Sequence, residues 1–241
     1  MLDRPKLSVV VPAYNEEERL PKYLPVFLDF PQKVDFPVEV IFVDDGSLDA
    51  TPQVIEEAIK GKEGFRLLRL PHRGKGAAVR EGMLRAKGEF RLFADADNAT
   101  PIEQAPLLLS KSGEGEGVIA SRYQKGAKFL RKQPLLRLLG SRFLNWLTRL
   151  VLLPGVSDTQ CGFKLFPAEV VERVFPRTRL RGFGFDLEVL AVARHLGYKI
   201  REIPVEWRDD PHSTVSPLRD GFRFIKDLAG IKFALMIGDY N

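Results

Sequence analysis

The sequence is poor in cysteine and has no long apolar run. Cys161 is the only cysteine among 241 residues, so no disulfide can form within the chain, and we expect a reducing compartment. No apolar run approaches the roughly 18–20 residues needed to cross a bilayer. Met1 to Lys6 carries charge and a proline in place of the apolar core of a signal peptide. We therefore expect a cytoplasmic protein that is soluble or lies peripherally on the cytoplasmic face of a membrane.

Acidic residues are missing from one long segment, although the net charge of the chain is small. There are 37 Lys and Arg against 32 Asp and Glu, and a formal charge of +5 by itself indicates no partner. No acidic residue lies between Glu116 and Asp158. This basic segment contains Arg122, Lys125, Lys128, Arg131, Lys132, Arg137, Arg142 and Arg149. A segment of one sign predicts an anionic partner such as a phosphate or a membrane surface, with a solvated helix face as the alternative. Nucleic acid fits poorly, because Leu and Phe alternate with the basic residues and no aromatic-lined groove is indicated.

The first half of the chain alternates between apolar runs and helical patterns. Short runs rich in β-branched and aromatic residues predict buried strands at 7–11, 38–43, 65–70 and 90–94. Helical patterns lie between these runs, for example at 76–87, which Gly88 ends. This β-α alternation predicts the α/β class, with a Rossmann-like, mostly parallel central sheet flanked by helices.

Polar residues follow three of these strands directly. Tyr14–Glu16 follows the first strand, Asp44–Asp45 the second and Asp95–Asp97 the fourth. In open α/β sheets ligands bind outside the carboxyl ends of the strands. We therefore expect the three clusters to converge on one crevice.

The spacing of Asp95 and Asp97 indicates a metal site. Two carboxylates one residue apart at a strand end can both approach one divalent ion, and Mg²⁺ and Mn²⁺ prefer such oxygen ligands. The ion would neutralise charge on a departing nucleoside diphosphate. Taken alone, an Asp-x-Asp pair is weak evidence, because two aspartates in a loop are more often a solvated turn.

Further segments beside the crevice could recognise a nucleotide. Asp44–Asp45 could accept hydrogen bonds from a ribose or a base, or could simply cap a turn. Pro12–Glu16 offers a ring for stacking together with polar groups. His72–Gly76 brings cationic groups to a helix N-terminus, which favours an anion, but it lacks the spacing of a Walker loop.

Taken together, the motifs resemble those of known enzymes. In order and spacing, the first set resembles the family 2 glycosyltransferases, which have the GT-A fold: Pro12-Ala-Tyr-Asn-Glu, Val43-Asp-Asp-Gly-Ser, Gly74-Lys-Gly-Ala-Ala-Val-Arg-Glu-Gly and Asp95-Ala-Asp. A second set resembles the dolichyl- and polyprenyl-phosphate sugar synthases, above all the β-glucosyltransferases: Ser121-Arg-Tyr, Asp158-Thr-Gln-Cys-Gly-Phe-Lys, Phe185-Asp-Leu-Glu and Ile203-Pro-Val-Glu-Trp. The resemblance runs from Leu7 to about Leu235.

The resemblance implies a role for particular residues. It implies a nucleotide site formed by Pro12, Ala13, Tyr14, Glu16, Asp44, Asp45, Lys75, Asp95, Ala96 and Asp97. It implies that Asp95 and Asp97 hold Mg²⁺ or Mn²⁺. It implies an acceptor phosphate site formed by Arg122, Lys125, Arg131 and Lys164. The residues expected at the reaction centre are Asp95, Asp97, Arg122 and Asp186.

Two departures from the family pattern affect the choice of substrate. Asn98-Ala99 follows Asp97, where mannosyl members often have a glutamine two places on that helps to bind metal. The glucosyl branch also lacks that glutamine, so UDP-glucose is favoured over GDP-mannose as the donor. His212-Ser-Thr-Val stands where relatives often have Gly-Ser-Lys-Val, so an acceptor contact at that place is in doubt.

The expected reaction is an inverting displacement by a lipid phosphate at the anomeric carbon. A phosphate monoester is already ionised near neutral pH and needs little general base. A soluble hydroxyl acceptor would need a base, and Asp186 would then be the first candidate. A nucleotidyltransferase and a phospho-receiver domain fit the motifs and the length less well. A non-catalytic nucleotide-sugar-binding module is the alternative from another class.

The predicted organisation is one catalytic domain with an amphipathic end. Residues 1–210 form the GT-A domain, with a nucleotide-sugar half at 1–115 and an acceptor half at 116–210. Residues 211–241 form an amphipathic segment that could associate with a membrane. Helical projections at 135–151 and 218–237 each show an apolar and a basic side. For 135–151, core packing and a place in a membrane interface are equally favoured; for 218–237, core packing is favoured.

Overall fold

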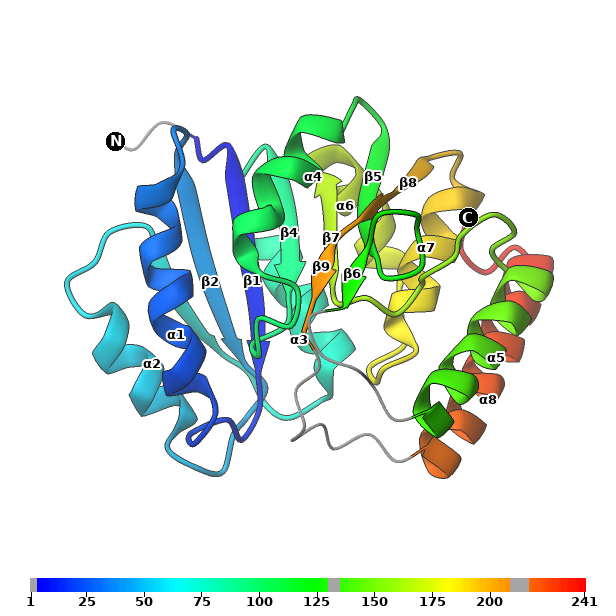
Figure 1. The fold of residues 1–241 in the computed structure, drawn as a ribbon, viewed down its shortest axis with the longest axis horizontal. Helices are drawn as coiled ribbons and strands as arrows, with labels where there is room; N and C mark the ends of the chain where they lie inside the picture. Colours follow the sequence, from blue (N-terminus) through cyan, green and yellow to red (C-terminus); the bar gives the residue numbers. More distant parts are fainter. Residues whose placement is uncertain (1–3, 130–134, 209–216) are drawn as a thin grey trace.

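The computed structural model describes residues 4–129, 135–208 and 217–241 (Figure 1). At its centre is a seven-stranded sheet in the order β3-β2-β1-β4-β7-β5-β8. The strands are β1 Leu7–Ala13, β2 Val38–Asp44, β3 Phe65–Arg69, β4 Phe90–Ala94, β5 Glu116–Ser121, β7 Phe163–Pro167 and β8 Lys199–Pro204. Only β7 runs antiparallel to its neighbours in this sheet. The predicted mostly parallel sheet, with its first four strands, is confirmed.

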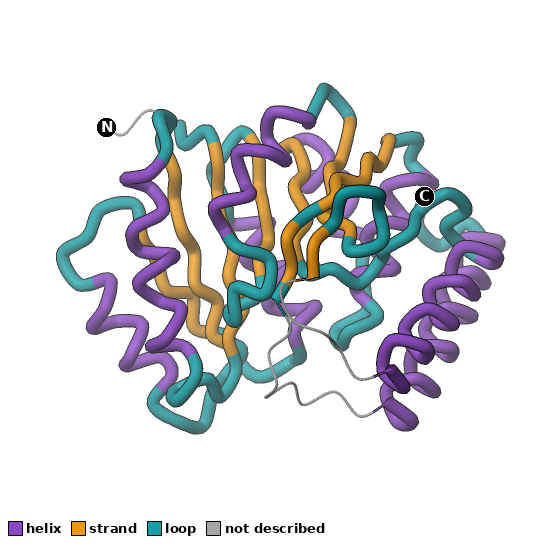
Figure 2. Tube along the Cα trace, in the orientation of Figure 1, coloured by secondary structure: helices purple, strands orange, loops and turns teal. Residues whose placement is uncertain are grey.

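Helices cover both faces of the sheet, as Figures 1 and 2 show. They are α1 Leu20–Asp29, α2 Thr51–Ile59, α3 Lys75–Arg85, α4 Ala105–Lys111, α6 Ala168–Val174 and α7 Phe185–His195, with short 3-10 turns η1 Phe30–Lys33, η2 Ile102–Gln104 and η3 Phe175–Arg177. Successive side chains of a strand point to opposite faces. On β1, Val9 and Val11 join the core beneath α1 and α4, and Val10 joins the core beneath α3 and α7. Burial on both faces explains why β1 reads as a continuous apolar run.

The second half of the chain adds a helix pair and a small strand pair. Helices α5 Leu135–Val151 and α8 Pro217–Met236 lie side by side at one end of the molecule (Figures 1 and 2). Strands β6 Lys128–Phe129 and β9 Glu206–Trp207 pair in parallel beside the main sheet. No helix within the described part of the chain is both long enough and apolar enough to cross a membrane. The domain boundary predicted at residue 210 stays a prediction.

Candidate active site

The end of β1 and the end of β2 form one side of the site. Pro12 and Ala13 are the last residues of β1, and Ala13 pairs with Asp44 at the end of β2. The carboxylate of Asp44 accepts a hydrogen bond from the backbone N–H of Ser47 at 3.3 Å, which closes a turn. Asp44 is 3% exposed and Asp45 is 2% exposed. Both carboxylates therefore shape the backbone here, as the turn interpretation expects, and contact with a nucleotide stays a prediction.

Asp45 stabilises the turn formed by His72, Arg73 and Gly74, which leads to Lys75. Its two carboxylate oxygens accept hydrogen bonds from the backbone N–H groups of Arg73 at 2.9 Å and Gly74 at 2.8 Å. Nδ1 of His72 lies 2.9 Å from the same carboxylate. Gly74 adopts a φ of +101°, and a Cβ there would lie 2.5 Å from the carbonyl oxygen of Arg181. Glycine is therefore required where this turn passes the loop before α7.

Tyr14 and His72 form an exposed aromatic stack beside the turn. Their ring centroids lie 4.1 Å apart with an interplanar angle of 23°, and Tyr14 is 36% exposed. His72 thus joins the ring of Tyr14 to the Asp45 carboxylate, and contact of this stack with a nucleobase stays a prediction. From the sequence we expected stacking by Tyr14, but we expected His72 only to contribute positive charge.

Glu16 points to a different partner from the one expected. Its carboxylate forms an ion pair with Arg19 in the next turn of the chain, and its backbone N–H donates to Oγ1 of Thr51 at 2.7 Å. The charge of Arg19 offsets part of the rise that burial and Asp95 cause in the pKa of Asp97. A role for Glu16 in nucleotide binding stays a prediction.

Asp95 and Lys75 form the centre of the site. Lys75, at the start of α3, places Nζ 2.5 Å from Oδ1 of Asp95, which directly follows β4. Burial would lower the pKa of Lys75, but the charges of Asp95 and Asp186 raise it, so the side chain stays a cation. A Cβ at Gly162 would lie 2.0 Å from Oδ2 of Asp95, so only glycine leaves room for this carboxylate.

Asp97 completes the acidic pair. Oδ1 of Asp97 accepts a hydrogen bond from the backbone N–H of Ala99 at 3.0 Å, while Ala96 between the two aspartates is 7% exposed. Burial, together with the negative charge of Asp95, raises the pKa of Asp97 to about 6. Crowding of this kind is relieved when a cation binds both carboxylates.

The donor set fits a divalent cation only as a partial site. Among the described residues, no cluster of three or more His, Cys, Asp or Glu side chains could hold a metal. A cation held by Asp95 and Asp97 would therefore take its other ligands from water or a bound diphosphate. Mg²⁺ and Mn²⁺ are the cations that are commonly held in this way, by a few carboxylates with water and phosphate.

Arg122 is held by Asp158, the first residue of a motif in the second set, to which the sequence analysis gave no role. Nε and Nη2 of Arg122 donate to the two carboxylate oxygens of Asp158 at 2.7 and 2.9 Å, and its backbone N–H donates to Oδ2 at 2.9 Å. The guanidinium lies 5.3 Å from the ring centre of Trp207. Burial would raise the pKa of Asp158, but the Arg122 charge and hydrogen bonds lower it. In the sequence, Asp158 is the first acidic residue after the basic segment, and this could have indicated it as a partner of a basic residue.

Lys164, which was expected at the acceptor phosphate, is engaged inside the protein, and a contact with the acceptor stays a prediction. Its side chain is fully buried, Nζ donates to the carbonyl of Cys161 at 2.7 Å, and it forms an ion pair with Asp186. The ammonium also lies 5.2 Å from the ring centre of Phe93. A contact with the lipid would require Lys164 to leave all of these partners. Burial raises the pKa of Asp186, and a role for Asp186 at the reaction centre stays a prediction.

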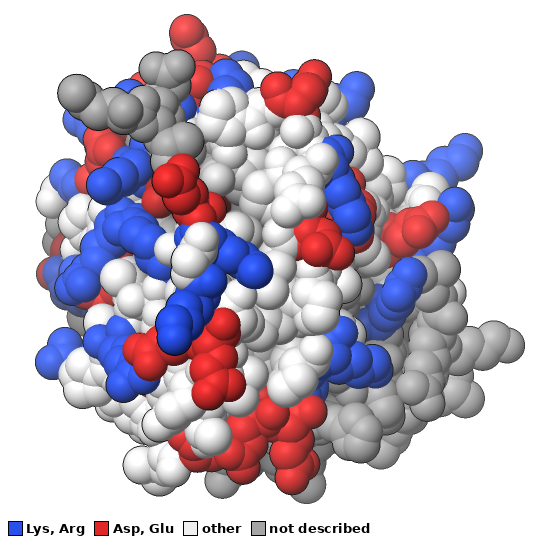
Figure 3. Space-filling model, turned by 90° about the vertical axis from the view of Figure 1, so that its left-hand side faces the viewer, with Lys and Arg blue, Asp and Glu red and all other residues white. Residues whose placement is uncertain are grey.

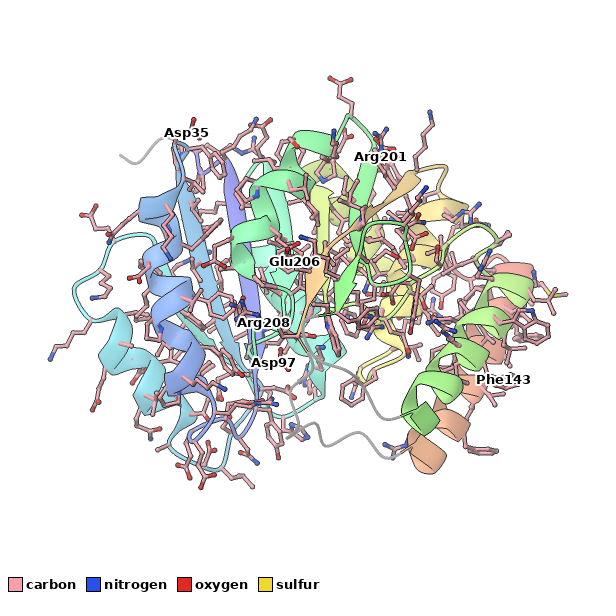
Figure 4. The ribbon with its side chains drawn as sticks, viewed as in Figure 1. Asp35, Asp97, Phe143, Arg201, Glu206 and Arg208 are labelled. Carbon is pink, nitrogen blue, oxygen red and sulfur yellow. The ribbon has the colours of Figure 1, made fainter. Side chains whose placement is uncertain are left out.

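Two further residues, Lys125 and Arg131, were expected at the acceptor phosphate. Lys125 is exposed in the loop after β5, and Arg131 lies outside the described residues. Arg208, which no sequence motif singled out, donates its backbone N–H to the carbonyl of Ala99 at 2.8 Å, beside the Asp97 turn (Figure 4). In the sequence, Arg208 is the basic residue that directly follows the Ile203–Trp207 motif.

Known proteins resemble this chain over most of its length. The family model for glycosyl transferase family 2 matches residues 8–175. The dolichyl-phosphate beta-glucosyltransferase of Dictyostelium discoideum is 34% identical, over 98% of this chain and 77% of the relative. The human protein of the same name is 36% identical, over 98% of this chain and 78% of the relative.

Solved structures share the fold at lower identity. Glucosyl-3-phosphoglycerate synthase from Mycobacterium tuberculosis, in complex with Mn²⁺, UDP-glucose and phosphoglyceric acid, superimposes with a TM-score of 0.71. The identity is 22%, over 95% of this chain and 80% of that chain. This similarity shows the GT-A fold and confirms the expected fold class. With the family model matching more than half of its length and relatives matching nearly all of it, the chain belongs to glycosyl transferase family 2.

Proposed function

We propose that this protein transfers glucose from UDP-glucose to a dolichyl or polyprenyl phosphate, with inversion at the anomeric carbon. The observation that carries the proposal is the near full-length similarity to dolichyl-phosphate beta-glucosyltransferases. The site supports it: Lys75 with Asp95 and Asp97 suits a metal-bound diphosphate, and the Tyr14–His72 stack suits a base.

The reaction is a displacement in which the anionic lipid phosphate attacks C1 of glucose close to the anionic diphosphate of the donor. An oxygen of the lipid phosphate forms a bond to C1 of glucose as the bond from C1 to the UDP oxygen breaks, and its electron pair leaves with UDP. The phosphate is ionised near neutral pH, so no group need remove a proton from it. Arg122 is the cation placed to reduce repulsion between the two anions, because Asp158 holds it in one orientation.

Asp95 and Asp97 would hold Mg²⁺ or Mn²⁺ together with the donor diphosphate. When bound, the ion supplies positive charge that stabilises the leaving UDP. Lys75 contributes a further fixed cation at the same place, since it already contacts Asp95. We expect metal dependence because the two carboxylates lie close together. Burial and the charge of Asp95 raise the pKa of Asp97, and a bound cation would offset that repulsion.

Helix α5 supports a place for the protein on a membrane surface. Its apolar stripe faces outward: Phe143 is 55% exposed, Trp146 56% and Leu150 68%. Its polar residues Asn145 and Thr148 face inward, at 5% and 0% exposed. This is the reverse of a helix that packs its apolar side on a core, so for α5 we favour the membrane interface. Figure 4 shows Phe143 on the outer side of the helix.

Helix α8 extends the same surface. Its inner side packs on the core through Phe224, Leu228 and Ile231, as the sequence led us to expect. Its outer side exposes a second apolar stripe, formed by Phe222, Ile225, Phe233, Met236 and Ile237. Exposed basic residues accompany the two stripes: Arg142, Arg149, Arg223, Lys226 and Lys232. Apolar stripes with basic neighbours match an anionic lipid surface.

The opposite end of the molecule differs in charge. The face beside α1 and α2 carries basic and acidic side chains side by side (Figure 3). The apolar and basic surface of α5 and α8 lies at the other end (Figure 1). We therefore place the membrane against α5 and α8, and a cytoplasmic location is part of the same proposal.

A transfer assay tests the proposed function. Purified protein is incubated with labelled UDP-glucose or GDP-mannose, a polyprenyl phosphate, and Mg²⁺ or Mn²⁺, and label is counted after extraction into organic solvent. We expect EDTA-sensitive lipid label from UDP-glucose alone. Lipid label from GDP-mannose would reassign the donor. Absence of lipid label while UDP-glucose still binds would move the acceptor to a soluble molecule. The Asp97→Asn variant is the inactive control.

A further inference from the structure

Glu202, which lies outside the site described above, binds two segments that lead to Arg122. Glu202 lies on the edge strand β8, opposite Ile119 of β5. Its Oε2 accepts hydrogen bonds from the backbone N–H and the hydroxyl of Ser157, both at 2.8 Å, and from Nε2 of Gln124 at 3.0 Å. Its Oε1 accepts one from the backbone N–H of Asp158 at 2.8 Å. One carboxylate thus ties the loop after β5 to the loop before β7.

The second of these loops carries the partner of Arg122. Asp158 is 0% exposed and receives three hydrogen bonds from Arg122, two from the guanidinium and one from the backbone. These use Nε and Nη2, while Nη1 makes no hydrogen bond with the residues that the structure describes. The direction of Nη1 therefore follows the position of the Asp158 carboxylate, and Glu202 holds the backbone N–H of the same residue.

We propose that Glu202 is a positioning residue for glucosyl transfer: it fixes Asp158 and Gln124, and through them the Arg122 guanidinium that meets the acceptor phosphate. The inference rests on the proposed function of Arg122. A carboxylate is needed, because all four groups that point at Glu202 are donors. A glutamine would turn an N–H₂ group toward at least one of them, which repels it. A displacement of about 1 Å in a group that orients substrate can cost about 100-fold in rate.

The first experiment compares Glu202→Gln with a matched control. Glu116 lies on the neighbouring strand β5, at the end away from Ser121, and pairs with Arg201 at 3.0 Å. For Glu202→Gln we expect kcat/KM for polyprenyl phosphate to fall about 10- to 100-fold, while KM for UDP-glucose stays within about twofold. Glu116→Gln should retain wild-type values for both. Loss confined to the donor KM, or equal loss in both variants, would overturn the proposal.

A double variant tests whether Glu202 acts through Asp158. If the two residues form one chain of contacts, Asp158→Asn together with Glu202→Gln should be no slower than Asp158→Asn alone. Multiplied losses would instead mean that Glu202 acts independently of Arg122 and would overturn the inference. Should Glu202→Gln fail to fold, Gln124→Ala removes a single hydrogen bond to the same carboxylate and should give a smaller loss of the same kind.

A chemical measurement separates this inference from the proposed function. Phenylglyoxal modification of Arg122 is followed by peptide mass spectrometry, without any substrate. We expect Arg122 to react several times faster in Glu202→Gln than in wild type, with Glu116→Gln unchanged. An unchanged rate in Glu202→Gln would overturn the inference even if wild type transfers glucose. If the rate rises but wild type transfers no glucose to lipid, the positioning stands and the proposed function fails.

Discussion

At the residue scale, the site is under electrostatic strain before any ligand binds. Asp95 and Asp97 crowd their charges into one turn, and a single ammonium, that of Lys75, is paired with Asp95. The pKa of Asp97 is raised to about 6 by burial and by Asp95. An acid whose pKa is raised on folding destabilises the folded state above its unfolded pKa, because it is charged there at a cost.

This strain predicts that the metal-free Asp97→Asn variant is more stable than wild type. The destabilisation by Asp97 begins as pH rises above about 4, its unfolded pKa, and is complete above about 6, its folded pKa. At pH 7.5 the gain should be at most about 3 kcal/mol, or several degrees in Tm, and it should shrink at pH 5. Calorimetry in EDTA measures it. An unchanged or lower Tm at pH 7.5 would contradict the strain. Transfer by the same variant should fall by on the order of 10²-fold or more.

A second residue-scale prediction concerns Gly162→Ala. The new Cβ would lie 2.0 Å from Oδ2 of Asp95, so the carboxylate must move away from its present place. We expect transfer to fall about 100-fold. Gly113→Ala is the control, because a Cβ there meets only a carboxylate oxygen at 3.7 Å. Steady-state kinetics at saturating metal measures both variants, and equal activities would show that Asp95 tolerates the shift.

At the element scale, the orientation of α5 is the informative observation. A helical projection cannot tell which side of an amphipathic helix faces the protein. Tertiary packing shows that Asn145 and Thr148 are the buried side. Oδ1 of Asn145 accepts a hydrogen bond from Thr159 at 3.3 Å, and Thr148 donates to the carbonyl of Leu144 at 2.9 Å. With Asn145 and Thr148 on the buried side, Trp146 is exposed, and its contact with a lipid surface stays a proposal.

The orientation predicts that Trp146→Ser with Leu150→Ser weakens membrane binding. Each side chain buries apolar area in lipid, so affinity for anionic vesicles should fall at least about tenfold. Binding should also weaken as salt rises, because the basic residues contribute. Co-sedimentation with vesicles measures this. Leu107→Ser on α4, where Leu107 is 41% exposed, should bind like wild type. Equal binding by all three proteins would remove α5 from the interface.

At the scale of the whole molecule, a hydrogen bond from Tyr240 joins the segment after α8 to α7. The hydroxyl of Tyr240 donates to Oε1 of the buried Glu188 on α7 at 2.7 Å. Oε2 of Glu188 accepts hydrogen bonds from the backbone N–H groups of Arg179 and Leu180 at 2.9 and 2.8 Å. The backbone then continues to Arg181, whose carbonyl accepts from Gly76 beside Lys75 at 2.7 Å. The segment that follows α8 is thus connected to Lys75.

This connection predicts a stability loss in Tyr240→Phe. Removing the hydroxyl leaves Oε1 of Glu188 buried without its donor, which costs about 1–3 kcal/mol, or roughly 2–10 °C in Tm. Asn241→Ala removes only an exposed contact with His195, so its Tm should stay within about 2 °C. Thermal unfolding measures both variants. A Tm for Tyr240→Phe equal to that of Asn241→Ala would show that Glu188 does not need the hydroxyl.

Much of the site followed from patterns that are local in the chain. The apolar runs that end at Ala13, Asp44 and Ala94 place their polar neighbours at one edge of a sheet, because parallel strands share their carboxyl ends. The motifs identified Asp95 and Asp97 as a pair. Partners distant in sequence were not predictable. Asp158 meets Arg122 only once β5 and β7 pair, and Asp186 meets Lys164 only once α7 packs on the sheet.

The sequence by itself determined the class of fold, the Asp-x-Asp turn and the family, because strand and helix periods and short motifs are properties of neighbouring residues. The tertiary structure decided which charges are available to a ligand. Lys164 and Arg122 are both basic residues of family motifs, yet the Lys164 side chain is fully buried on Asp186, while 13% of the Arg122 side chain stays exposed. The tertiary structure also decided which side of α5 faces outward. Burial and long-range pairing set both outcomes, and neither depends on neighbouring residues alone.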